Sequence, residues 1–287
     1  MYYSRVKMRL AFVLSPAKTL NMSRMERLTE SSEPAFEKQT EQIARVLSSM
    51  SVGNLKALYN SSDSIAKLNH QRFQEFSIDT KENAKERYKE AVYAFDGPAF
   101  RGLAAETLDD SEMEYCQTHL RILSGLYGLL RPFDKIQAYR LEMGQKLAIP
   151  STGTKDLYSL WGSLLAKSIN LLYAGEASET KILLNLASKE YFRAVDTDAL
   201  DESICVVECV FKDDGRVKTV YAKRARGLMA LYLIKKRIET IEDVQGFNLE
   251  GYQFDTNQST DSVLVFQRSK RNMPVKSTEQ SRKRRRE

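Results

Sequence analysis

Apolar residues along this 287-residue chain occur in two patterns, as short continuous runs and as sets repeated at helical spacing. The continuous runs have the length of β-strands and predict strands at 9–14, 120–123, 181–186, 204–211 and 263–267. The helical spacing predicts a mainly α segment between Pro34 and Phe76, with further helices at 111–119, 158–172 and 227–238. Because strands and helices alternate without a repeat or linker, we expect a single compact α/β domain, mixed α+β in content, with a mixed sheet and surrounding helices.

Two local signals add detail to this outline. The turn residues Asp213-Asp214-Gly215 separate the apolar run 204–211 from residues 216–221, and this arrangement predicts a β-hairpin. Ser111 and Glu114 have the spacing of a capping box, so we expect a helix to begin at Ser111.

Composition limits the class of protein. The chain is 42% hydrophobic and 29% charged, as in a globular protein with a buried core. Its longest apolar runs, such as residues 11–14, are far shorter than the roughly 18 residues that cross a bilayer, so we expect no membrane partner. Three cysteines without a close pair indicate a reducing compartment, and we expect a cytoplasmic location.

Positive charge is concentrated near the end of the chain. The formal net charge is +6, but the residues from Arg268 onward include nine basic and two acidic ones, which leaves the preceding body at −1. The segment 269–287 lacks aromatic residues, so we expect a domain over 1–268 followed by a basic disordered tail. If the source is eukaryotic, such a tail is also typical of a nuclear-localisation signal. Any electrostatic case for DNA binding by the body must rest on local patches.

Three of the predicted strands end in small polar residues. The tips carry Ser15, Ser124 and Ser188, with Asn185 in the third strand and Lys18 just after the first. Ligands of open α/β sheets bind beyond the carboxyl ends of strands, so these residues predict an anion-binding pocket with Lys18 as its cation. The alternative is that each serine only caps a turn or a helix.

A second candidate is a basic run near the start of a predicted helix. Residues 218–237 contain no acidic residue, and Lys223, Arg224 and Arg226 stand where the helix is predicted to begin. Free backbone N–H groups and guanidinium groups together bind phosphate, so the pattern predicts an anion site. The alternative is a solvated basic surface.

A third candidate is a pair of short helices in 50–56 and 64–69, joined by a tight polar turn at 59–63. Backbone N–H groups with Lys56 and Lys67 would contact a DNA phosphate, as helix-hairpin-helix elements do. The glycines usual in such a turn are replaced by Asn60 to Ser62, and two packed helices without a ligand have the same pattern.

A fourth candidate places a phenol, a guanidinium and a carboxylate within four positions, as Tyr139, Arg140 and Glu142. Arg140 and Glu142 either pair with each other or hold a base or sugar, with Trp161 or Tyr191 stacked on it.

Metal and cofactor chemistry has little support in the sequence. The two histidines, His70 and His119, do not stand at metal-ligand spacings. There is also no nucleophile elbow and no Walker-type phosphate loop, so we expect no metal site and no cofactor.

Several motifs occur in one order along almost the whole chain. They are LSPAKTL at 14–20, LSGLYGLLRP at 123–132, YRLEMG at 139–144, LY and WG at 157–158 and 161–162, NLAS and EYF at 185–188 and 190–192, YAK and ARGLM at 221–223 and 225–229, and GF and EGY at 246–247 and 250–252. Together they resemble the YaaA family of peroxide-stress resistance proteins.

The resemblance implies a compact α/β fold peculiar to that family, with a positively charged cleft and a helix-hairpin-helix element that binds DNA. It also implies a cellular role in surviving hydrogen peroxide, associated with low levels of unincorporated iron. On this chain the hairpin element would be residues 51–69. The cleft residues would be Lys18, Arg140, Lys223 and Arg226. Ser64 departs from the family pattern, in which a lysine is common after the aspartate.

The leading hypothesis is therefore a binding module that engages duplex or structured DNA, mostly through phosphates, and limits oxidative damage. The rival is an enzyme acting on a nucleotide or damaged nucleobase in a basic cleft, where a small anionic ligand would bind. Its catalytic candidates are Lys18, Tyr139 and Glu142. A third hypothesis is a scaffold whose tail alone binds nucleic acid.

Overall fold

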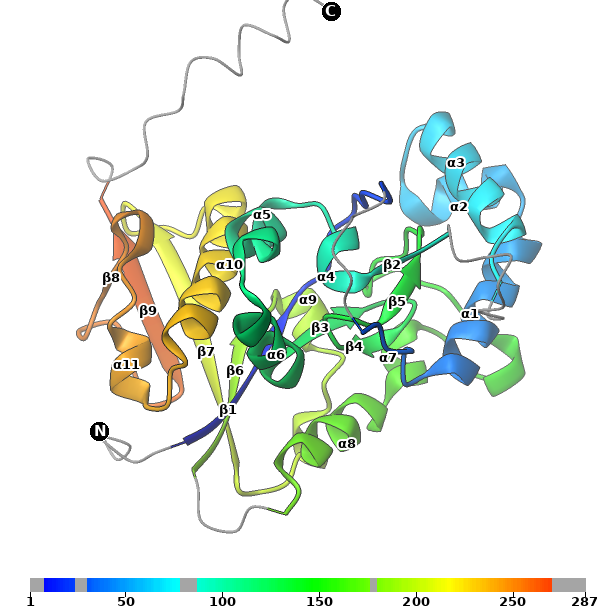
Figure 1. Ribbon diagram of the computed structural model, residues 1–287. Coiled ribbons are helices and arrows are strands. Elements are labelled where there is room, and N and C mark those ends of the chain that lie inside the picture. The colour runs from blue at the N-terminus through cyan, green and yellow to red at the C-terminus, as the bar shows by residue number, and fades with distance from the viewer. Residues whose placement is uncertain (1–7, 24–29, 78–86, 176–179, 270–287) are drawn as a thin grey trace, which may run out of the picture.

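A seven-stranded mixed sheet forms the centre of the protein (Figure 1). The computed structural model describes residues 8–23, 30–77, 87–175 and 180–269. Along the sheet the strands follow the order β4 (Gly128–Leu130), β3 (Leu120–Ser124), β1 (Met8–Leu14), β6 (Thr180–Leu186), β7 (Ile204–Asp213), β9 (Val263–Arg268) and β8 (Gln253–Phe254). The inner five strands pair in parallel, and β4 and β8 add antiparallel edges. A separate antiparallel pair joins β2 (Tyr88–Glu90) to β5 (Lys135–Gln137).

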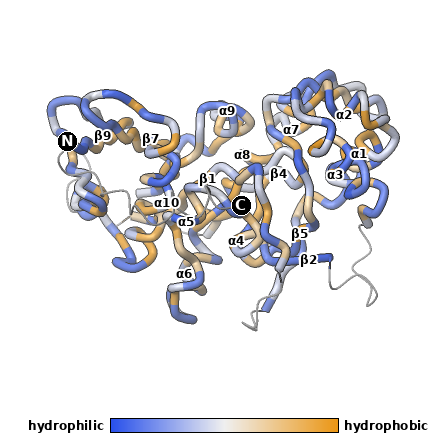
Figure 2. The backbone as a smooth tube through the Cα atoms, turned by 90° about the horizontal axis from the view of Figure 1, so that it is seen from above, coloured by the Kyte–Doolittle hydropathy of each residue, from blue (hydrophilic) through white to orange (hydrophobic). Residues whose placement is uncertain are grey.

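Helices cover both sides of the sheet and form a group at one end of it. They are α1 (Glu37–Ser49), α2 (Val52–Tyr59), α3 (Asp63–Gln74), α4 (Ala91–Ala94), α5 (Pro98–Leu103), α6 (Asp110–His119), α7 (Leu157–Trp161), α8 (Leu164–Asn170), α9 (Lys189–Phe192), α10 (Thr219–Lys236) and α11 (Ile241–Gln245). Seen from above, α5, α6 and α10 lie on one side of the strands and α9 on the other (Figure 2). Helix α3 contacts both α1 and α2, and the three helices lie together at one end of the molecule (Figure 1).

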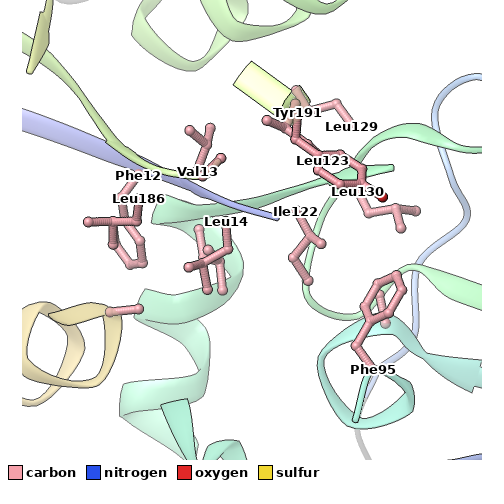
Figure 3. Close-up of a cluster of buried hydrophobic side chains, with 14 of the residues drawn as sticks. Phe12, Val13, Leu14, Phe95, Ile122, Leu123, Leu129, Leu130, Leu186 and Tyr191 are labelled. Carbon is pink, nitrogen blue, oxygen red and sulfur yellow. The ribbon is translucent and has the colours of Figure 1, made fainter. Parts of the chain in front are cut away.

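The central strand β1 is buried on both faces. Six of its seven residues are buried, because a parallel strand lies on each side and helices cover the sheet above and below. Figure 3 shows Phe12 and Leu14 on one face of the strand and Val13 on the other. Leu14 packs beside Ile122 of β3 and Leu186 of β6, so the carboxyl ends of three strands share one apolar floor.

Helices α5 and α10 touch through their backbones, because glycine occupies the contact on both sides. A Cβ on Gly227 would lie 1.7 Å from the carbonyl oxygen of Ala99. A Cβ on Gly102 would lie 2.4 Å from the carbonyl oxygen of Arg224. Neither position has room for a side chain, so the two helices approach more closely than any other residue pair would allow here.

The predicted mixed α/β class is confirmed, and strands lie at each of the five predicted places. No helix in the described part of the chain has the length and hydropathy of a membrane span. The predicted tail 269–287 lies outside the described residues except for Ser269, and the division into domain and tail stays a prediction.

The predicted β-hairpin at 204–221 is wrong. The turn itself forms, with Asp214 and Gly215 at positive φ, and the amide of Asp213 donates to the carbonyl of Arg216 over 2.8 Å. The chain then enters α10 at Thr219 instead of pairing back. Strand β9 occupies the edge of β7 that the hairpin would have used.

Three helix predictions also need correction. The helix predicted at 158–172 is broken at Gly162, whose φ of +41° ends α7 before α8 begins. Helix α10 begins at Thr219, eight residues before the predicted start at 227. The capping box of α6 is formed by Asp109 and Glu112, not by Ser111 and Glu114, because the Asp109 side chain accepts from the Glu112 amide over 2.9 Å.

We expect the substitution Gly227→Ala to lower the free energy of unfolding by about 1–3 kcal/mol, because the added methyl group meets backbone that cannot move aside. For a chain of this size that is a fall in Tm of about 2–4 °C per kcal/mol, measurable by thermal unfolding. Gly53→Ala in α2 is the matched control, since its Cβ would meet only Ser51 Oγ at 3.8 Å. The control should be neutral or stabilising by up to about 1 kcal/mol. A Gly227→Ala protein as stable as the control would contradict the close contact.

Candidate functional site

A cleft of about 590 Å³ lies beyond the carboxyl ends of β1 and β6. From β1 the sheet continues toward β3, and from β6 it continues toward β7 on the other side. The loops that follow these two strands therefore diverge and leave a crevice between them, which is the usual ligand position in open α/β sheets. The segment after β6, the start of α5 and the side of α10 complete its walls.

Two serines join the strand tips at the floor of the cleft. The Ser188 amide donates to Ser15 Oγ over 2.8 Å, and Ser15 Oγ donates to Ser188 Oγ over 3.3 Å. Both residues line the cleft, so the structure brings these two strand tips together. Each hydroxyl thus has a defined position and a remaining capacity for a ligand hydrogen bond.

Lys18 and Glu142 line one wall of the cleft and form a row of alternating charges with Arg140, which is not part of the lining. The Glu142 carboxylate lies between two cations, with Oε2 at 2.5 Å from Lys18 Nζ and Oε1 at 3.2 Å from Arg140 Nη2. The guanidinium of Arg140 lies 5.9 Å from the ring centroid of Tyr59 in α2. Arg140 and Glu142 do pair, as one of the two predictions for them required, and the shared carboxylate leaves this group with a net charge of +1.

The opposite wall of the cleft lies on α10. Lys223 and Arg226 line the cleft, and no ion pair joins either of them to a carboxylate within the described ranges. Arg226 is partly buried, and its Nε is shielded from solvent without a hydrogen-bond partner. Burial lowers the pKa of the Arg226 guanidinium, and Glu208 opposes that shift from beyond ion-pair distance. A buried cation without a close counter-ion is costly, and an anion in the cleft would offset that cost.

The structure does not bring Ser124 and Tyr139 to the cleft. Ser124 is completely buried, shares a hydrogen bond of 2.6 Å with Tyr139 Oη, and accepts from the Tyr127 amide over 3.0 Å. Burial also raises the pKa of Tyr139. Their hydrogen bonds to each other and to backbone place them in the core beneath the β3 tip. Asn185 is buried as well, and its Oδ1 accepts from the Ala187 amide over 2.8 Å, which shapes the β6 tip.

Arg224 lies on a different face of α10 from Arg226. Its Nε and Nη2 lie 2.7 and 2.6 Å from Glu250 Oε1. Glu250 also approaches Arg268 Nη1 at 3.5 Å, and Arg268 Nε lies 2.8 Å from the buried Asp213. Arg224 therefore belongs to an ion network that ties α10 to β7 and β9. Because α10 begins at Thr219, the three cations are inside the helix, and the predicted site at its first N–H groups does not form.

Helices α2 and α3, joined by Asn60 to Ser62, lie where the hairpin element was predicted. Lys56 Nζ is 2.7 Å from Asp63 Oδ1, and this contact lowers the pKa of Asp63. Lys67 is exposed and has no ion pair with a described residue. The element contacts the segment that holds Glu142, since Gln145 Nε2 donates to the Leu58 carbonyl over 3.4 Å and Gln145 Oε1 accepts from the Glu142 amide. Its role as a helix-hairpin-helix stays a prediction.

Several cleft residues were not foreseen. Lys189 and Glu190 follow Ser188 directly, and extending the strand-tip rule by one helical turn would have found them. Glu190 Oε1 accepts from the Gly144 amide over 3.1 Å. Asp96 and Arg101 form a two-contact pair at 2.8 and 3.1 Å on the α5 side, which no pattern in the sequence predicts. Tyr191 lines the cleft, as foreseen for a stacking residue, whereas Trp161 is fully buried.

The described residues contain no group of three or more His, Cys, Asp or Glu side chains placed to hold a metal ion.

The residues that match known proteins include all those that line the cleft. A family model described as peroxide stress protein YaaA matches residues 10–258. A UPF0246 protein of Alteromonas mediterranea is 43% identical over 262 residues, 90% of this chain and 97% of that protein. UPF0246 proteins of Caulobacter sp. strain K31 and Bordetella petrii are 41% and 42% identical over 263 and 264 residues, in each case 90% of this chain and 99% of theirs.

We expect Glu142→Gln to lower the free energy of unfolding by about 1–3 kcal/mol, because it leaves two cations without their carboxylate, one of them only 17% exposed. Lys18→Met should cost less than about 1 kcal/mol, since that side chain is 55% exposed and the Arg140–Glu142 pair survives. Urea unfolding of both variants measures the difference. If both variants lost the same free energy of unfolding, the buried Arg140–Glu142 pair would contribute no more than the exposed Lys18–Glu142 pair, against this prediction.

Proposed function

The chain belongs to the peroxide stress protein YaaA family, and from that premise we propose that it protects cells under peroxide stress by binding DNA, duplex or structured, mostly through phosphates. The observation that carries the proposal is the α10 wall, where Lys223 and Arg226 face the cleft without carboxylate partners in the described structure. Local excess positive charge attracts phosphate even in a protein whose body is nearly neutral.

The α2–α3 element extends this surface. It lies beside the segment that carries Glu142, with Tyr59 near Arg140 and Leu58 hydrogen-bonded to Gln145. Lys56 neutralises Asp63, which would otherwise repel a phosphate at the start of α3, and Lys67 is exposed one turn further along. In the proposed complex these helices contact the backbone of DNA next to the cleft, which positions the nucleic acid without reading its sequence.

The family resemblance extends the proposal to iron. Free intracellular iron reacts with hydrogen peroxide to damage DNA, and we propose that the protein acts in limiting this damage. The measurement for this part is the level of free iron in peroxide-treated cells, with and without the protein, by whole-cell electron paramagnetic resonance. Unchanged free iron would remove this part and leave the DNA proposal standing.

We expect DNA affinity to fall with salt at a log–log slope of about −0.9 for each neutralised phosphate. Lys67→Ala should weaken binding to duplexes of different sequence alike and reduce the slope by about one phosphate, because a lysine that contacts phosphate carries no sequence information. Fluorescence anisotropy over a salt series measures both. Lys167→Ala is the matched control, since that lysine is exposed on α8, away from α2 and α3 in Figure 1. Affinity independent of salt would overturn the proposal.

A second candidate function is an enzyme acting on a nucleotide or damaged base, and the pairing of Lys18 with Glu142 on the cleft wall favours it. An ammonium group paired with a carboxylate places a proton donor and a proton acceptor side by side, as acid–base catalysis requires. Lys18→Ala distinguishes the candidates: loss of peroxide protection with intact DNA affinity supports the enzyme, whereas parallel loss of both supports the binding module. Survival in hydrogen peroxide and anisotropy on the same variant are the two readouts.

A further inference from the structure

The two long walls of the cleft differ in how their cations are paired, and this difference should orient a charged ligand. The α10 wall holds Lys223 and Arg226 without ion pairs in the described residues, while the facing wall pairs Glu142 with both Lys18 and Arg140. An anion gains most at the α10 wall and least beside Glu142, where a carboxylate oxygen would repel it.

The rest of the lining suits a neutral group that carries hydroxyls or amino groups. Glu142 and Glu190 present carboxylate oxygens, which accept hydrogen bonds from amino groups and sugar hydroxyls. Ser15 and Ser188 either donate or accept. Pro16, Pro98 and Tyr191 add ring faces on which a flat heteroaromatic ring can pack.

The volume limits the size of such a ligand. About 590 Å³ lies within the range of roughly 300–1,000 Å³ typical of small-molecule sites. The close approach of α5 and α10 at Gly102 and Gly227 fixes one side of the opening. On the other side, the Ser15–Ser188 hydrogen bonds fix the floor. The cleft therefore has room for one small molecule or for one nucleotide of a DNA strand.

We propose that the cleft binds one nucleoside monophosphate unit, with its phosphate on Arg226 and Lys223 and its sugar and base toward Ser15, Ser188 and Glu190. The unit is either a free mononucleotide or a single nucleotide turned out of a DNA strand. This deepens the proposed function, and it rests on that function only for the second source.

The test uses the full chain and three probes: deoxyadenosine 5′-monophosphate, deoxyadenosine and inorganic phosphate. By isothermal titration calorimetry, the monophosphate should bind at least tenfold more tightly than either of the others, because only it uses both ends of the cleft. Arg226→Met should weaken monophosphate binding at least tenfold and leave deoxyadenosine binding unchanged. Arg226→Lys should recover part of the loss.

The matched control is Lys236→Met, which removes one positive charge from the exposed end of the same helix and should bind the monophosphate as the unchanged protein does. Thermal unfolding tests whether Arg226 has a structural role instead. Without ligand, Arg226→Met should unfold at the same temperature as the unchanged protein or higher, because the lost guanidinium had no ion pair, whereas the stabilisation by monophosphate should disappear. A monophosphate that binds no better than phosphate, or an Arg226→Met protein that binds it normally, overturns the inference.

The two sources are separated with a fully paired duplex and the same duplex carrying one extrahelical nucleotide. If the nucleotide comes from DNA, the second duplex binds more tightly and Arg226→Met abolishes the difference. Equal affinities, with monophosphate binding intact, assign the cleft to a free nucleotide. If the monophosphate does not bind but duplex binding still depends on Lys67 and on salt, this inference alone is wrong. If the monophosphate binds and the duplex does not, only the DNA proposal is wrong.

Discussion

The backbone contact between α5 and α10 is the constraint on which the cleft depends. Gly102 and Gly227 remove the side chains that would separate the helices, and Arg226 is the residue next to one of these glycines. A bulkier residue at either position would shift α10 away from the strand tips and carry Arg226 and Lys223 with it. Packing and function thus meet in one short stretch of helix, where a small residue is required for the charged neighbour to reach its place.

The electrostatics of the protein are local. The net charge says little, because most of the surplus lies after β9 and the body is almost neutral. Within the body, ion pairs absorb Lys18, Arg101, Arg140 and Arg224, each through a carboxylate at short range. Lys223 and Arg226 have no such partner among the described residues, so their charge remains available to an anion. A partly buried guanidinium among paired charges is a stronger anion receptor than several solvated lysines.

The sequence predicted the sheet well and the α10 region poorly, for a physical reason. Runs such as 9–14 and 181–186 are apolar on both faces, so they read as buried parallel strands without knowledge of their neighbours. Residues 216–221 read as a strand because Val217 and Val220 are β-branched, but both are exposed, and the segment takes its structure from the packing of α10. Ser15 and Ser188 were found by the strand-tip rule. Ser124 followed the same rule, yet its hydroxyl turns into the core to meet Tyr139, a partner that spacing cannot reveal.

The ion network around Arg268 extends the folded unit beyond the residues that match the family. The family match ends at residue 258, but Arg268 is 3% exposed and neutralises an Asp213 that has no exposure at all. Strand β9 also covers the edge of β7 that faces away from β6. The matched segment is therefore shorter than the structural unit: a fragment that ended at residue 258 would lose β9 and leave Asp213 without the cation that compensates it.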